Sequence, residues 1–148
     1  MRKEKGFTLI ELLIVTALIG VLSSMAMTGF SVYRASAAYA VVERTVSSAR
    51  TAAEAGLSDA DNPPAAVALT SVNTQGPLPG AAGDYLVGMQ VPSNVKVEVE
   101  YDPTCTTALC QSELVEVKHC WGNEFARWIR YGDGVDILLQ NVAGEGCS

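Results

Sequence analysis

A single carboxylate, Glu11, interrupts an otherwise uncharged and apolar stretch that runs from Phe7 to Met27. A glutamate deep in a bilayer costs around 3 kcal/mol on insertion scales, so it usually marks a functional site with a partner. If the chain were cut between Gly6 and Phe7, the new α-amino group would lie close to Glu11 in sequence. That positive charge would neutralise Glu11 of a neighbouring copy once two such helices packed together.

Four cysteines form the second group with chemical potential: Cys105, Cys110, Cys120 and Cys147, all in the last third of the chain. An even number confined to this region is typical of disulfides made in an oxidising compartment. We favour Cys105 with Cys110 and Cys120 with Cys147, although four cysteines allow three pairings and the sequence does not choose among them. A zinc site is the alternative, but neither pair has the two-residue spacing of a zinc knuckle.

Catalytic and metal-binding patterns are weak in this sequence. His119 is the only histidine, and we expect a structural or surface role for it. Asp133, Asp136 and Glu145 suggest calcium, but the segment GDGVD lacks the ligand series of an EF-hand, so a turn with solvated charges is preferred. We therefore expect no catalytic residue, no metal and no cofactor. A membrane-anchored enzyme or ligand-binding protein is the alternative class, and it predicts no cleavage at Gly6.

The apolar stretch from Phe7 to Met27 would be about 32 Å long as a helix, enough to cross a bilayer. The basic residues before it predict that the leader stays in the cytoplasm and the remainder is translocated. A simple anchor and a secretory signal peptide are the ordinary interpretations. A signal peptide would be cut after the apolar stretch, where Ser23, Ser24 and Ala26 supply small residues.

Helical character continues without proline to about Leu57, so an unbroken helix from Thr8 would be about 75 Å long. Arg34, Arg44 and Arg50 lie mostly off its apolar stripe, on faces open to water or to other subunits. The stripe recurs at spacings of three and four and should cover a sheet. It consists of Val32, Ala35, Tyr39, Val42, Val46, Ala49 and Ala53.

The remainder of the chain reads as a sheet preceded by an irregular connection. Gly56 and the polar residues after it end the helix, and the Pro-, Gly-, Ala- and Thr-rich segment to about Gly83 predicts irregular structure. Alternation or turn signals then indicate four strands, at about 95–101, 113–121, 125–131 and 135–140. The sequence therefore predicts an α+β fold with a four-stranded antiparallel sheet laid on one long helix.

At its N-terminus the chain resembles the type IV pilins and the pseudopilins of type II secretion. The resemblance is carried by a short basic leader, by Lys5-Gly6 directly before Phe7, and by FTLIELLIV with Glu11 fifth after the cut. It is close over about the first 25 residues and only architectural afterwards. It implies cleavage after Gly6 by a prepilin peptidase, N-methylation of Phe7 by the same enzyme, and assembly in which Glu11 pairs with a neighbour's Phe7 amine.

The resemblance also implies a division of the chain. Residues 1–6 would be a cytoplasmic leader, residues 7–30 the transmembrane and assembly half of the helix, and residues 31–148 a pilin head domain. In pilins the C-terminal disulfide region is often the exposed face of the fibre, so residues 120–147 are expected to be displayed. One departure is Thr28, which stands where many pilins carry a proline that would kink the helix.

The function implied is that of a structural subunit of a type IV pilus, with the major pilin as the leading hypothesis and a minor pilin or pseudopilin as the alternative. Expected partners are copies of the chain in a helical filament, the prepilin peptidase and N-methyltransferase, the inner-membrane assembly platform, and lipid before assembly. The subunit would pass once through the bacterial inner membrane and then enter an extracellular pilus. The net charge of -6 disfavours bulk nucleic-acid binding.

Overall fold

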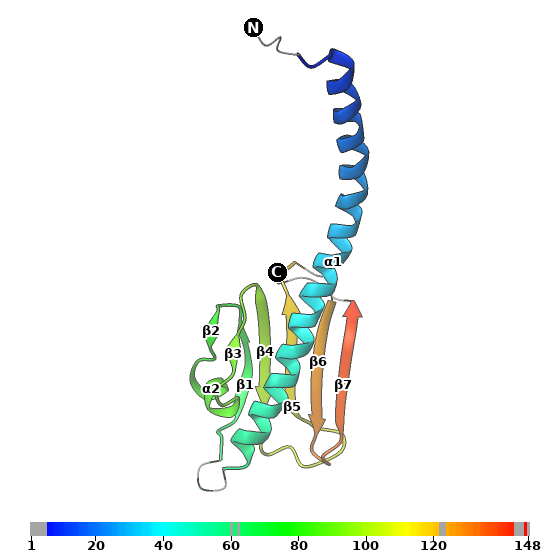
Figure 1. Ribbon diagram of the computed structural model, residues 1–148. Coiled ribbons are helices and arrows are strands. Elements are labelled where there is room, and N and C mark those ends of the chain that lie inside the picture. The colour runs from blue at the N-terminus through cyan, green and yellow to red at the C-terminus, as the bar shows by residue number, and fades with distance from the viewer. Residues whose placement is uncertain (1–5, 60, 62, 122–123, 144–146, 148) are drawn as a thin grey trace. The chain divides into compact units, whose positions relative to one another are not determined.

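A computed structural model describes residues 6–59, 61, 63–121, 124–143 and 147 of the chain. Two compact units are present: one ends at Ser36, and the other, the head, comprises residues 37–148. The long helix α1 (Leu9–Leu57) contributes residues to both units. In the head, its last turns lie across one face of an antiparallel sheet (Figure 1). The long helix and the sheet predicted from the sequence are therefore confirmed.

Helix α1 runs without interruption through Gly20, Thr28 and Gly29. No proline falls within it, so every turn keeps its backbone donors. At its C-terminal end the N–H of Ser58 donates to the carbonyl oxygen of Glu54 at 3.1 Å, and the Ser58 hydroxyl donates to that of Ala55 at 2.7 Å. These bonds satisfy carbonyls that a helix end would otherwise leave without partners.

The main sheet has five antiparallel strands in the order β1-β4-β5-β6-β7, so β1 and β7 are its edges. The strands are β1 (Val67–Val72), β4 (Val95–Tyr101), β5 (Gln111–His119), β6 (Glu124–Tyr131) and β7 (Asp136–Ala143). Beside it, β2 (Gly76–Pro77) pairs with β3 (Gln90–Val91), and the short helix α2 (Gly80–Tyr85) lies between them in sequence. The strands β4 to β7 form a meander in which each strand pairs with the next.

All four predicted strands are present, but the expectation of an irregular connection up to Gly83 was wrong, because this segment contains β1, β2 and the start of α2. The predicted number of four strands was also wrong, because β1 is a fifth strand of the sheet and pairs with β4. Its buried side chains are Val67 and Val72, five positions apart, and the register shifts between Val67 and Thr70. A bulge of this kind places two buried residues at opposite parity, which removes the period-two signal used to recognise strands.

The hydrophobic core of the head lies between the last turns of α1 and the sheet. Val42, Val46, Ala49 and Ala53 are fully or almost fully buried in it, as the predicted stripe requires. Facing them are valines from alternating positions of β4 and β5, together with Trp128 of β6, which is 0 % exposed. The core positions on these strands are Val95, Val97 and Val99 of β4, and Val115 and Val117 of β5.

The predicted stripe was too long at its N-terminal end. Val32 and Ala35 are exposed and belong to the unit that ends at Ser36, whereas burial begins at Ala38. Only residues of α1 within the head share a core with the sheet. The same three-four spacing continues on both sides of Ser36, so periodicity alone could not locate this boundary.

Candidate functional site

The N-terminal segment places Glu11 in the first turn of α1, where it forms a capping box with Thr8. The backbone N–H of Thr8 donates to Oε2 of Glu11 at 2.9 Å, and the Thr8 hydroxyl donates to the same oxygen at 2.7 Å. In return the N–H of Glu11 donates to the Thr8 hydroxyl oxygen at 3.4 Å. Such reciprocal bonds satisfy donors that every helix leaves open at its N-terminus. The positive end of the helix dipole also favours a carboxylate here.

Sequence reasoning identified Glu11 but did not assign a role to Thr8. The signal was nevertheless present, because threonine followed three residues later by glutamate, before an apolar run, is the signature of a capping box. Thr8 acts by holding the Glu11 side chain back toward the start of the helix. The two residues together fix where the carboxylate lies relative to Phe7.

Gly6 and Phe7 precede α1 outside regular secondary structure, and both are exposed. Phe7 is 84 % exposed, and a Cβ placed on Gly6 would meet no atom within 4 Å. The bond between them is therefore open to an approaching enzyme along the described part of the chain. Residues 1–5 of the expected leader lie outside the described residues. The contact between Glu11 and a neighbour's Phe7 would join two chains, and it stays a prediction.

Apart from Glu11, the first turns of α1 carry no charge and are mostly apolar on all sides. By length and composition the helix is able to cross a membrane, and none of the segment that meets this criterion is buried inside the chain. Large apolar side chains, among them Leu9, Ile14 and Leu22, are each more than half exposed. A helix that is apolar all round requires lipid or other helices around it.

The expected disulfide bonds are present in the head, where they join Cys105 to Cys110 and Cys120 to Cys147. The first bond closes a short loop between β4 and β5. The second ties the residue that follows β5 to the end of the chain, across a separation of 27 positions. No free cysteine occurs among the residues that the structure describes, so the zinc alternative finds no thiolate there.

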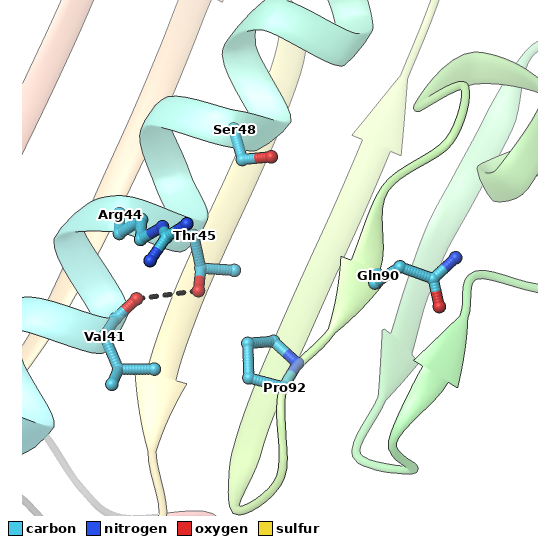
Figure 2. Close-up of a pocket in the computed structure, with 6 residues that line it drawn as sticks. All are labelled: Val41, Arg44, Thr45, Ser48, Gln90 and Pro92. Carbon is cyan, nitrogen blue, oxygen red and sulfur yellow. Dashed lines mark hydrogen bonds between the residues drawn. The ribbon is translucent and has the colours of Figure 1, made fainter.

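A hollow of about 320 Å³ opens in the head between α1 and the segment around β3 (Figure 2). Val41, Arg44 and Ser48 line it from the helix, and Gln90 and Pro92 line it from the opposite side. Thr45 also contributes, although its hydroxyl donates to the Val41 carbonyl oxygen at 2.7 Å. The hollow therefore combines an exposed cation, a hydroxyl and an amide with apolar walls. Sequence analysis placed Arg44 off the buried stripe, and the structure agrees.

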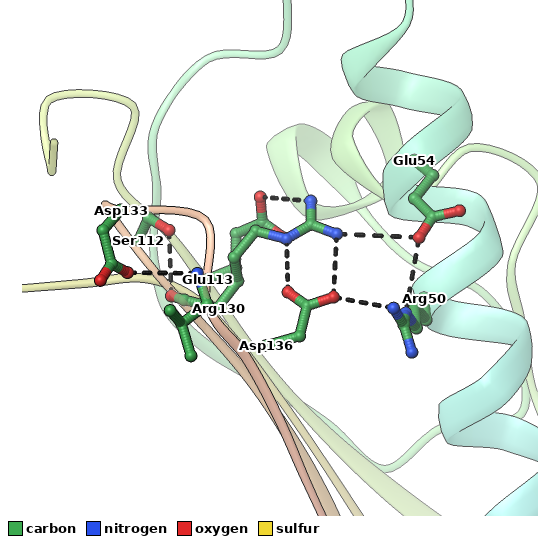
Figure 3. Close-up of polar contacts among 8 residues, drawn as sticks. Arg50, Glu54, Ser112, Glu113, Arg130, Asp133 and Asp136 are labelled. Atoms are coloured by element: carbon green, nitrogen blue, oxygen red, sulfur yellow. Dashed lines mark hydrogen bonds and ion pairs between the residues drawn. The ribbon is translucent and has the colours of Figure 1, made fainter. Parts of the chain in front are cut away.

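A network of ion pairs connects the last turns of α1 to β7, one of the two edge strands of the sheet (Figure 3). Asp136, at the start of β7, accepts from Nε of Arg130 at 2.7 Å and from Nη2 of Arg50 at 2.8 Å. Arg130 also reaches Glu113 at 3.3 Å, and Arg50 lies 3.4 Å from Glu54 within α1. Arg50 is thus partly engaged within the head, although the sequence placed it on an open face.

This network shifts the pKa values of its carboxyl groups in opposite directions. The hydrogen bond from Arg130 holds the pKa of Asp136 below its usual range. Burial raises the pKa of Glu113, although the charge of Arg130 partly offsets the effect. Burial likewise raises the pKa of Tyr85, whose ring stacks on Tyr101 with 4.5 Å between ring centroids.

The sequence predicted a turn with solvated charges at Asp133 and Asp136. This description holds for Asp133 but not for Asp136. The carboxylate of Asp133 is exposed and accepts from the N–H of Val135 at 3.1 Å, whereas Asp136 belongs to the network. Glu145, the third residue considered for calcium, lies outside the described residues. Within the described ranges no group of three or more metal-ligating side chains is gathered for a metal ion. His119 is buried, and its Nδ1 accepts from the N–H of Trp121 at 3.2 Å.

Comparison with known proteins bears on the N-terminal part of the chain. Residues 1–27 match the family model of the prokaryotic N-terminal methylation motif. Two fimbrial proteins of Pseudomonas aeruginosa are each 42 % identical to this chain over 57 residues, which is 38 % of this chain. The match covers 37 % of each relative, so it spans little more than a third of the relatives' length.

The apolar helix, its capped Glu11 and the matched motif define a chain with a prokaryotic N-terminal methylation segment. The long helix packed on an antiparallel sheet is consistent with the type IV pilin fold. Together with the fimbrial relatives, these findings support the type IV pilin family.

Proposed function

We propose that this chain is the major structural subunit of a type IV pilus, polymerised through the first part of α1. The observation that carries the proposal is the exposed apolar surface of that helix, with Glu11 as the one carboxylate in its first turns. The methylation motif over residues 1–27 and the fimbrial relatives support it. Before assembly the subunit would lie in the bacterial inner membrane with its N-terminus in the cytoplasm.

Processing would prepare the assembly contact. A prepilin peptidase cuts between Gly6 and Phe7 and methylates the new amine, which removes the basic leader and leaves a cationic N-terminus. In one chain the carboxylate of Glu11 is held by Thr8 through a single oxygen, Oε2. A carboxylate has about four acceptor sites, so Glu11 can also accept from an ammonium group.

The same pairing would set the position of each subunit along the filament. Two exposed apolar helices pack against each other in many registers with similar contact areas. An unpaired carboxylate in an apolar surrounding is costly, so registers that leave Glu11 without a cation are disfavoured. The charge pair therefore selects one register, while burial of apolar side chains supplies attraction. The assembly platform and its energy source would be other proteins.

Mass spectrometry of sheared surface fibres tests the proposal. Abundant chains that begin with methylated Phe7 are expected if this is the major pilin. Processed chains confined to the cell envelope would instead identify a pseudopilin, and trace amounts in fibres made mainly of another subunit would identify a minor pilin. Chains that keep residues 1–6 would contradict the processing step and favour a membrane-anchored protein of another class.

Replacement of Glu11 by alanine separates processing from assembly. We expect Glu11→Ala to be cut after Gly6 as in the wild type, because the cleaved bond does not involve its side chain. Fibre yield should fall by about tenfold or more, the change that corresponds to about 1.4 kcal/mol per contact. Immunoblots of sheared and membrane fractions measure both steps.

Glu43→Ala is the matched control, because it removes another exposed carboxylate from α1 outside the apolar stretch. The control should assemble normally. Wild-type fibre yield from Glu11→Ala would disprove the proposed pairing with Phe7.

A further inference from the structure

The head carries six lysines and arginines, and five of them lie in ion pairs. Arg50 and Arg130 belong to the Asp136 network, Lys96 pairs with Glu98 at 3.0 Å, and Lys118 and Arg127 both pair with Glu116. The remaining cation is Arg44. In the part of the chain that the structure describes, no carboxylate forms a salt bridge with it. In an acidic protein, one unmatched arginine beside a hollow is a candidate contact for a carboxylate from another chain.

The surroundings of Arg44 suit such a carboxylate. Ser48 and Gln90 offer a hydroxyl and an amide around the same hollow, and Val41 and Pro92 offer apolar surface. An arginine can donate two parallel hydrogen bonds to one carboxylate, which adds geometric selectivity to the attraction. The hollow therefore fits an acidic side chain on a protein surface.

Carboxylates of the required kind gather at the C-terminal end of α1 in the same chain. A second hollow, of about 310 Å³, is lined by Asp59 and Asp84 together with Ala55, Gly56, Gly83 and Val87. Among the described residues, no lysine or arginine contributes to this lining. Asp61 is exposed nearby, and its N–H donates to Oδ1 of Asp59 at 3.2 Å. We call Asp59, Asp61 and Asp84 the acidic end of the head.

The Arg44 hollow and the acidic end lie at different levels along α1. From Arg44 to the helix end at Leu57 the axial rise is about 20 Å at 1.5 Å per residue. Two complementary surfaces at different positions on one molecule make a heterologous contact. Each copy contacts one neighbour through its Arg44 hollow and another neighbour through its acidic end. Repetition of such a contact produces an open helical filament when the rotation does not close a ring.

We propose that the Arg44 hollow receives the acidic end of an adjacent copy of this chain, through a salt bridge from Arg44 to Asp59 or Asp84. The inference rests on the proposed function, because it assumes that copies are arranged along a filament. It assigns a contact between heads in addition to the contact at Glu11. The hollow carries the positive charge of Arg44 and the acidic end carries negative charge. One chain therefore supplies both complementary surfaces.

Charge reversal followed by charge exchange tests the contact. Arg44→Glu should lower fibre yield by about tenfold, because like charges would then face each other in a contact that was attractive. Asp84→Arg and Asp59→Arg each reverse the opposite surface. Arg44→Glu combined with one of them should recover fibre yield to within about threefold of wild type. Arg44→Gln, which removes the charge without reversing it, should give an intermediate loss.

Asp133→Arg serves as the matched control for Asp59→Arg and Asp84→Arg, because it also raises the net charge by two, at an exposed turn that lines neither hollow. It should assemble normally. Processed subunit in the membrane fraction, measured for every variant, verifies that each one folds and is cut. Wild-type yield from Arg44→Glu, or failure of both exchanges to recover fibres, would overturn the contact. Absence of fibres from the wild-type chain would instead overturn the proposed function, so the two failures are distinct.

Discussion

At the scale of single residues, the start of α1 gives one carboxylate two tasks. Glu11 completes the capping box with Thr8, and in the proposed filament it also meets the amine of Phe7. The first task keeps the side chain close to the helix start, where that amine would lie. Loss of Thr8 would therefore affect assembly without removing any charge.

His119 is the residue whose protonation should be visible in solution. Burial lowers the pKa of His119 below its ordinary value, and its Nδ1 already accepts from the Trp121 N–H, so the fold requires the neutral ring. A group with a depressed pKa contributes stability that is present above the unfolded pKa of about 6.5 and is lost as pH falls through the folded value. We therefore expect the head to lose stability below about pH 6.5.

The measurement is the free energy of unfolding of the processed chain in detergent, followed by tryptophan fluorescence from pH 8 to pH 5. His119→Gln should show a shallower decline toward pH 5 than the wild type. Because His119 is the only histidine in the sequence, the difference between the two curves isolates this side chain from the carboxyl groups. Parallel curves would show that its protonation does not couple to folding.

Among the helices and strands, those with a regular sequence pattern were predictable. Features that depend on tertiary contacts were not. The end of α1 at Leu57 and the alternation of β4 follow from proline, glycine and period-two patterns. The strand β1 could not be recognised from the sequence, because its bulge disrupts the period-two pattern. Glu116 is only 2 % exposed although it alternates with the core valines of β5, because Lys118 and Arg127 of the neighbouring positions cover it.

In the candidate site, too, some residues could be selected from the sequence and others could not. Gly6, Phe7 and Glu11 stand at fixed spacing within one continuous segment, so the sequence was sufficient to select them. The Asp136 network joins residues 86 positions apart, from Arg50 to Asp136. No local pattern encodes a contact of that separation. The hollow beside Arg44 likewise exists only because β3 returns to lie near α1.

Two glycines of α1, Gly29 and Gly56, should respond in opposite ways to replacement by alanine. A Cβ on Gly56 would stand 2.4 Å from the carbonyl oxygen of Tyr85, whereas a Cβ on Gly29 would meet nothing within 4 Å. Alanine favours a helix over glycine by about 1 kcal/mol. We expect Gly29→Ala to be neutral or stabilising, and Gly56→Ala to destabilise by about 1 to 3 kcal/mol through overpacking.

Chemical denaturation of the two variants side by side in detergent measures this difference. Both replacements add the same methyl group to the same helix, so each is the control for the other. Equal effects would mean that α2 moves away freely and that the close approach at Gly56 does not constrain the head.

At the scale of the whole molecule, the two disulfide bonds should differ in how much they stabilise the head. In the chain-entropy description, a closed loop lowers the entropy of the unfolded chain by an amount that grows with loop length. The loop from Cys120 to Cys147 has a separation of 27 positions, against five for Cys105 to Cys110. The expected contributions are about 3.6 and about 2.2 kcal/mol respectively.

Replacement of each pair by serines, compared by urea denaturation of the processed chain, tests this order. Removal of Cys120 and Cys147 should lower the free energy of unfolding by about 1.4 kcal/mol more than removal of Cys105 and Cys110. The reverse order would show that the short loop contributes mainly through native contacts, such as its close approach to Gly132.

The bond between Cys120 and Cys147 also decides how the head would respond to a pull between the two ends of the chain. Tension arriving through β5 would pass directly across the sulfur atoms, so β6 and β7 would carry none of the load. The bypassed segment corresponds to about 90 Å of fully extended chain, at 3.3 to 3.6 Å per residue. A subunit stretched between its ends would therefore extend less, by that contour length, than one without this bond.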